Sequence, residues 1–308
     1  MRNKSKLFLA FCLLLFASKV SALECDENNY INSHNVEMTC NQLQNLKSLG
    51  FSDFEITYMN QEEFDLNKDL KGEVVAETTK YYRTTTFYPD NALLVSMPNF
   101  QPISISEEIT KEEYELAEPH VEEGTRGLTN GVTSTEYKLM TTTIINLGSN
   151  YRYKNVVSWK KAPATYHYDI IGIGIEQTKV YGVSSSKYIH SIHTELSNNA
   201  CYDEETYSGT WSLSATGYAV KFKLPSNSVL QGVFDQLVTT MYFTVEKTDN
   251  NTITVLNAYG NYRHATSSFP NTSFSFSINL GYISIGGSYS SYYDSISTAQ
   301  ATWTGLNW

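Results

Sequence analysis

The sequence has few cysteines, few charged residues and, after its first segment, no long hydrophobic run. Of its 308 residues, 18% are charged and 4 are cysteine, and acidic residues outnumber basic ones by 32 to 22. A formal net charge of −10 provides no attraction for the phosphate backbone, so nucleic-acid binding is not expected. No later run approaches the roughly twenty apolar residues that a membrane-spanning helix needs.

The sequence also lacks the short motifs of common enzyme classes. It has no Gly-x-Ser-x-Gly elbow, no His-Glu-x-x-His helix and no phosphate-binding loop. Antiparallel folds assemble glycosidase carboxylates from distant strands, so no such pair can be assigned from the sequence. A secreted hydrolase is therefore the third alternative, and no cofactor is predicted.

The N-terminal segment is typical of a signal peptide. Three basic residues in Met1–Lys6 precede the apolar run Leu7–Ala17, and Val20-Ser21-Ala22 has the small-residue pattern of a signal-peptidase site. We expect residues 1–22 to be removed by cleavage after Ala22 and the protein to be secreted.

Charge divides the remaining chain into two parts. Residues 23–125 hold 21 acidic and 6 basic residues, whereas residues 126–308 hold 11 and 12. Three glycines between Gly124 and Gly131 are typical of a connecting loop. We therefore predict an acidic helical head with the first strand or strands over 23–125, and a β domain over 126–308.

Helix-capping patterns recur in the acidic part. Thr39 precedes a helical run that ends at Gly50, and capping residues stand three positions before a glutamate at Ser52, Asn60 and Thr110. The pattern predicts a small bundle, with a partner-binding helical module as the alternative. The residues that we expect it to bury are Leu46, Leu49, Phe51, Phe54 and Ile56.

From Val74 onward, apolar and polar residues alternate with period two, which predicts strands. Tyr168–Glu176 is almost continuously apolar and should be a central strand. Eight to ten short strands favour a mainly β fold, an antiparallel, jelly-roll-like sandwich. Two local exceptions are a short helix over Ser228–Leu237 and a bulge at Gly281, where the alternation changes parity.

Removal of residues 1–22 would leave three cysteines. Cys25 and Cys40 are close enough in sequence for a local disulfide, which leaves Cys201 as a free thiol in an acidic context that disfavours a nucleophile.

No metal site is predicted, and the one calcium candidate is incomplete. Asp65, Asn67 and Asp69 have the alternate spacing with which a calcium loop begins, but Leu70 and Ala76 occupy the positions that need glycine and glutamate. A solvated acidic connection explains these residues better. His167 and Asp169 share a strand face, and two ligands alone make a weak site.

The aromatic residues near the C-terminus suggest a binding surface, because flat rings stack on sugars. The candidates are Tyr289, Tyr292, Tyr293, Trp303 and Trp308. Packing at edges and in the core is the competing explanation. The alternating segment Ser273–Gly287 gives the second functional alternative, a membrane-inserting hairpin that is apolar outward and wet inward.

Two stretches carry a resemblance. Leu46–Ile56, continued by Met59–Phe64, and Val157–Pro163, continued by Tyr168–Ile173, together resemble a group of uncharacterised exported proteins of Gram-positive bacteria. The resemblance implies a secreted, two-part bacterial protein and no particular activity. The sequence thus predicts a non-catalytic protein of the cell surface or medium that binds glycan, cell wall or another protein.

Overall fold

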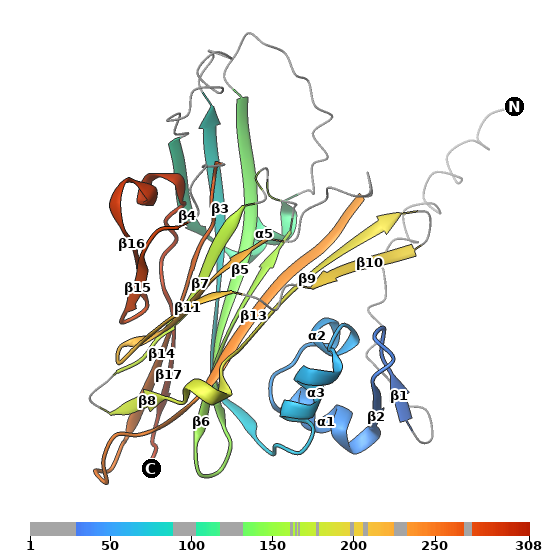
Figure 1. Ribbon diagram of the computed structural model, residues 1–308, viewed down its shortest axis with the longest axis vertical. Helices are drawn as coiled ribbons and strands as arrows, with labels where there is room; N and C mark the ends of the chain where they lie inside the picture. The colour runs from blue at the N-terminus through green and yellow to red at the C-terminus, as the bar shows by residue number, and fades with distance from the viewer. Residues whose placement is uncertain are drawn as a thin grey trace, which may run out of the picture. The chain divides into compact units, whose positions relative to one another are not determined.

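The computed structural model describes residues 29–88, 103–117, 132–160, 163, 165, 167–176, 179–197, 200–205, 209–224, 233–267 and 273–308 (Figure 1). The chain forms two compact units. The small unit comprises the described residues up to Lys47 and Phe51–Asp69, and the large unit comprises Ser48–Gly50 and Leu70–Trp308.

The small unit combines a two-stranded sheet with short helices. Its elements are β1 (Asn29–Ile31), β2 (Glu37–Thr39), α1 (Cys40–Ser48), α2 (Asp53–Thr57) and α3 (Gln61–Asn67). The caps at Ser52 and Asn60 are confirmed, since each side chain accepts a hydrogen bond from the backbone N–H three residues later.

The expected burial in the small unit is largely confirmed. Leu46, Phe51 and Ile56 are buried, whereas Phe54 is partly exposed. Leu49 is buried as well, but it belongs to the large unit. Asn32 joins the sheet to the helices, because its amide donates to the carbonyls of Ile56 at 3.0 Å and Met59 at 2.6 Å.

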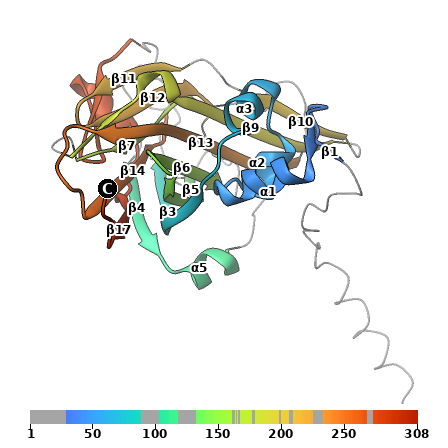
Figure 2. The same cartoon turned by 90° about the horizontal axis from the view of Figure 1, so that it is seen from below.

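An eight-stranded antiparallel sheet forms one layer of the large unit. Along the sheet, its strands are β10 (Ala200–Glu205), β9 (Tyr188–Ser197), β13 (Val233–Lys247), β6 (Tyr151–Trp159), β5 (Val132–Asn146), β3 (Glu73–Tyr88) and β4 (Ile103–Ile109). The short β8 (Val180–Gly182) pairs with β13, and η1 is Ser184–Ser186. Helix α5 (Lys111–Leu116) follows edge strand β4 directly (Figure 2) and has the capping box predicted at Thr110.

A five-stranded antiparallel sheet forms the second layer. Its order is β11 (Thr210–Ser214), β12 (Gly217–Lys223), β7 (Tyr168–Gly174), β14 (Val255–Arg263) and β17 (Ala299–Thr304). The predicted central position of β7 is confirmed. Both sheets contribute buried side chains to one core, and Asn155 of β6 crosses it to the carbonyls of Gly172 and Asn261 at 3.2 and 3.3 Å. The predicted antiparallel sandwich is therefore confirmed.

A small hairpin, β15 (Phe276–Asn279) and β16 (Tyr282–Ile285), covers the other face of the five-stranded sheet, ahead of η2 (Gly287–Tyr292). The sheet leaves room for it at Gly172 and Gly174. A Cβ added at Gly174 would lie 1.9 Å from the backbone nitrogen of Gly281. The predicted bulge at Gly281 is wrong, because Leu280 and Gly281 form a two-residue turn with φ of 45° and 76°.

Two further expectations differ from the structure. Val233–Leu237 belongs to strand β13 and not to a helix, because it pairs with β9 and the strand continues beside β6. The two units divide between Asp69 and Leu70, while the boundary expected near Thr125 lies outside the described residues. Strands β3 and β4 belong to the large unit.

The segment 1–22, expected to be a signal peptide, also lies outside the described residues. Among the helices that the structure describes, none has the length and apolar character to cross a bilayer.

Candidate functional site

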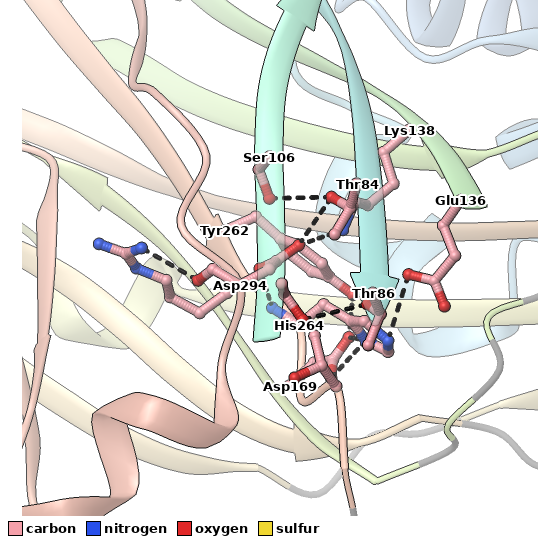
Figure 3. A network of polar contacts seen from close by, with 12 residues as sticks. Thr84, Thr86, Ser106, Glu136, Lys138, Asp169, Tyr262, His264 and Asp294 are labelled. Carbon is pink, nitrogen blue, oxygen red and sulfur yellow. Dashed lines mark hydrogen bonds and ion pairs between the residues drawn. The ribbon is translucent and has the colours of Figure 1, made fainter. Parts of the chain in front are cut away.

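Five ionisable side chains meet inside the sandwich, and we call them the buried charged cluster (Figure 3). They are Glu136, Lys138, Asp169, His264 and Asp294. Glu136 and Lys138 come from β5, Asp169 from β7, His264 directly follows β14, and Asp294 lies between η2 and β17. None of these side chains is more than 4% exposed.

Strand alternation places these charges inside the sandwich. Asp169 has the same parity as the core residues Ile171 and Ile173 of β7, and Lys138 has the same parity as Met140. His264 likewise continues the parity of Tyr262. The inward rows of β7 and β14 are therefore apolar with the charge at one end, and in β5 Glu136 and Lys138 precede the apolar Met140 and Ile144 in the inward row.

Asp169 is surrounded by hydrogen-bond donors. Its carboxylate oxygens lie 2.9 and 3.1 Å from His264 Nδ1, and it also accepts from the Tyr262 hydroxyl and the Ala265 N–H. Burial alone would lower the pKa of His264, but the neighbouring carboxylates of Asp169 and Glu136 raise it above its ordinary value. Glu136 lies 3.7 Å from the opposite ring nitrogen, Nε2.

Lys138 and Asp294 form the second pair of the cluster. Lys138 Nζ contacts Asp294 Oδ2, and both side chains are 0% exposed. The ammonium also lies 4.6 Å from the ring centre of Trp159. Burial would raise the pKa of Asp294, but the charges of Lys138 and His264 outweigh it and hold that pKa below its ordinary value.

Backbone and hydroxyl groups fix the Asp294 carboxylate. Oδ1 accepts the His264 N–H at 2.8 Å, and Oδ2 lies 3.4 Å from the Thr84 hydroxyl oxygen. Thr84 is in turn 3.0 Å from the Ser106 hydroxyl, and Thr86 is 3.0 Å from that of Ser104. This row of hydroxyls joins the buried charged cluster to edge strand β4.

In this structure, the buried charged cluster cannot act on a free substrate. The side chains of Lys138, Asp169 and His264 have no exposed surface, so a solute cannot reach them without opening the sandwich. Reactions available here are those between the protein's own groups. Among the residues that the structure describes, no three or more His, Cys, Asp or Glu side chains are arranged so that they could hold a metal ion.

Two of the five aromatic residues that were expected to form a binding surface are buried. Tyr292 and Tyr293 are each only 7% exposed, because they pack with the hairpin on the outer face of the five-stranded sheet. Tyr289 stacks on Phe274 at 5.2 Å. Trp303 and Trp308 are partly buried against the main core. Packing thus accounts for most of the set.

The calcium candidates are part of helix α3 or follow it. Asp65 pairs with Lys68 at 2.6 Å, and the buried Asn67 amide donates to the Glu63 carbonyl at 2.7 Å. Asp69 lies just beyond the helix. Helical turns therefore replace the loop that calcium would need.

Cys40 is disulfide-bonded. Cys25, its predicted partner, lies outside the described residues, as does the side chain of Cys201.

The inserting-hairpin candidate is folded onto the protein. Its strands β15 and β16 have four residues each, against the roughly nine to eleven that a membrane-crossing strand needs. Ile278 and Ile283 are buried against the five-stranded sheet, while Ser277 and Ser284 are exposed. Its apolar face thus already has a protein partner.

Sequence reasoning singled out Asp169, with His167 as its neighbour, and missed Glu136, Lys138, His264 and Asp294. The available signal was a charged residue at an inward parity of a strand, which needs a partner to be buried.

No protein family and no curated protein matches the chain. Three of the solved structures that match are similar to part of the chain. A chain titled BspA_C_WT matches with 7% identity and a TM-score of 0.27, over 60% of this chain and 80% of its own. AvmM, which catalyses macrocyclisation in alchivemycin A biosynthesis, matches with 8% identity and a TM-score of 0.23 over 51% and 80%.

The RrgB pilus protein of Streptococcus pneumoniae matches with 8% identity and a TM-score of 0.26, over 74% of this chain and 53% of its own. The resemblance to this bacterial surface protein is weak.

Proposed function

We propose that the protein acts outside the cell as a non-catalytic binding protein and that its partner is another protein, held along strand β4. The observation that carries the proposal is an apolar patch at a sheet edge. Ile103 is 68% exposed, Ile105 is 56% exposed, and Phe87, which stands opposite Ile103 on β3, is 42% exposed. Large exposed apolar residues on an edge strand are typical of interaction sites.

An edge strand favours a partner that contributes an extended segment. β4 lies at the end of the eight-stranded sheet, and its row of apolar residues at alternate positions would contact alternate side chains of an added strand. The ionisable groups of the buried charged cluster are sealed in the sandwich, which supports a role without catalysis. The burial of Tyr292 and Tyr293 favours a protein over a glycan.

Charge indicates the composition of that segment. Residues 103–117, which contain β4 and α5, carry five glutamates and one lysine. Glu107 and Glu108 neutralise Arg83 and Lys80 of β3, each at 2.8 Å, and the remaining glutamates lie on α5. We therefore expect a segment with alternating apolar residues and basic residues toward the α5 end.

Peptide binding tests the proposal. The probes are fluorescent peptides of alternating valine and threonine with lysine ends, a matched peptide with glutamate ends, and a scrambled form of the first, read by anisotropy. We expect saturable binding of the lysine-ended alternating peptide and about tenfold or greater weakening by Ile105→Lys, which corresponds to about 1.4 kcal/mol.

Leu213→Lys is the matched control, because Leu213 is 44% exposed on β11, the edge strand of the other sheet. It should leave binding unchanged. Equal weakening by both variants, or no saturation by any peptide, would contradict the proposal. A dimer seen by sedimentation velocity and dissociated by Ile105→Lys would also contradict the proposal, because the segment bound to β4 would then belong to a second copy of the chain.

A further inference from the structure

Lys138 and Asp294 are far apart in sequence and in direct contact in space. They are separated by 156 positions, and the amine of one meets the carboxylate of the other inside the sandwich (Figure 3). Neither side chain has exposed surface. The site is therefore a nucleophile and a carboxyl carbon held together without bulk water.

The surroundings make the charged form of the pair costly. The Trp159 ring faces Lys138 Nζ at 4.6 Å and offers it no full negative charge. Removing an ammonium and a carboxylate from water carries a large desolvation cost, which their mutual attraction has to offset. A neutral link between the same atoms would avoid that cost.

The groups around Asp294 match those that acyl chemistry requires. The backbone N–H of His264 donates to Oδ1 at 2.8 Å, and negative charge would develop on Oδ1 during attack on Cγ. The Thr84 hydroxyl lies 3.4 Å from Oδ2, the oxygen that would leave. Fixed contact between two reacting groups also supplies a high effective concentration.

We propose that Lys138 and Asp294 condense into an intramolecular amide that joins β5 to the segment before β17. A proton first passes from the Lys138 ammonium to Asp294 Oδ2, which gives an amine and a carboxylic acid. Nζ then attacks Cγ, and the electron pair of the carbonyl moves onto Oδ1. The second proton passes from Nζ to Oδ2, the Cγ–Oδ2 bond breaks, and one water molecule leaves as the carbonyl re-forms.

The step balances with the two side chains alone, because ammonium and carboxylate yield one amide and one water. Thr84 and the His264 N–H are positioning groups in this scheme. The inference is independent of the proposed binding function, since it concerns only groups inside the sandwich.

Peptide mapping of the full-length purified protein, reduced and digested with trypsin, tests the proposal directly. The chain has no lysine or arginine after Arg263, so Asp294 lies in the tryptic peptide 264–308. An amide at Lys138 blocks cleavage there. We expect one branched species that joins 127–152 to 264–308, with a mass lower than their sum by one water molecule.

Lys154, which is also buried, is the internal control and should be cleaved normally. Recovery of 127–138, 139–152 and 264–308 as separate linear peptides from the wild-type protein would overturn the proposal. This measurement needs no variant, so a failure of variants to fold cannot obscure it.

Intact mass gives a second test that is insensitive to where the N-terminus is processed. The difference between wild type and Lys138→Arg should depart from the side-chain difference by one water molecule, and Asp294→Ala should show the same departure. Lys154→Arg should show none. Mass differences that equal the side-chain values for all three variants would identify the pair as an ion pair only.

Discussion

Asp169 Oδ2 lies 2.9 Å from His264 Nδ1, and neither side chain has any exposed surface. Each residue makes the burial of the other tolerable, since an unpaired charge in the interior would cost several kcal/mol. His264 directly follows β14, and Asp169 lies near the start of β7. The contact therefore also aligns two neighbouring strands of the five-stranded sheet.

The raised pKa of His264 makes stability depend on pH. A group with a raised folded-state pKa contributes its full stabilisation below its unfolded value of about 6.5, and this contribution is lost as pH rises through the folded value. We expect the melting temperature of the wild type to fall over that window and His264→Gln to lose this component. Ser277→Ala, which removes no titratable group from an exposed site, is the control and should keep the wild-type slope. Parallel profiles for wild type and His264→Gln would contradict the prediction.

Asp169→Asn removes the charge while it keeps the shape of the side chain. His264, the Tyr262 hydroxyl and the Ala265 N–H would then share a weaker acceptor. We expect the free energy of unfolding in urea to fall by about 3–5 kcal/mol, as for other broken buried pairs. Asp249→Asn, at an exposed site, should change it by less than about 0.5 kcal/mol. A small effect at Asp169 would mean that the pair contributes little to stability.

Leu280→Asn should stabilise the protein. Leu280 has a φ of 45°, which is costly for leucine, and its side chain is 51% exposed, so little packing is lost. Asn-Gly is the preferred pair for a two-residue turn with both φ values positive. We expect a gain of about 1 kcal/mol, measured by urea unfolding. Leu213→Asn, in strand β11, should give no gain, and an unchanged or lower stability for Leu280→Asn would contradict the reasoning.

Gly174→Ala should displace the β15–β16 hairpin. The added Cβ would meet backbone atoms of Leu280 and Gly281, which cannot rotate away as a side chain can. We expect faster hydrogen exchange of the amides in β15 and β16, with β5 and β6 unchanged. Ser277→Ala, on the exposed side of the hairpin, should exchange as the wild type does. Equal exchange in Gly174→Ala would show that the hairpin position tolerates the methyl group.

The fold was predictable where local patterns agree with pairing. The caps at Ser52 and Thr110 depend only on a glutamate three positions later. The almost uninterrupted apolar run of β7 indicates a central strand. Strand β4 was missed because Glu107 and Glu108 weaken its alternation. Their partners, Arg83 and Lys80, become visible only when β3 lies beside them.

The buried charged cluster was not predictable in full. Lys138 at an inward position signals that a buried anion exists somewhere, but alternation along β5 cannot name Asp294, which is 156 positions away. The burial of Tyr292 and Tyr293 could not be predicted from the sequence for a similar reason. Whether Tyr292 is exposed depends on the hairpin that folds over it, and that placement is a property of tertiary packing.

The strand order of the five-stranded sheet has a consequence for the order of assembly. β17 pairs with β14 and supplies Ala299 and Ala301 to the core, and Asp294 arrives just before it. A chain synthesised from its N-terminus therefore holds Lys138 without its counter-ion until the 156 positions up to Asp294 have been added. Closure of the sandwich depends on contacts between distant parts of the chain, and such folding is slow. The proposed amide between Lys138 and Asp294 can therefore form only after these contacts have been made.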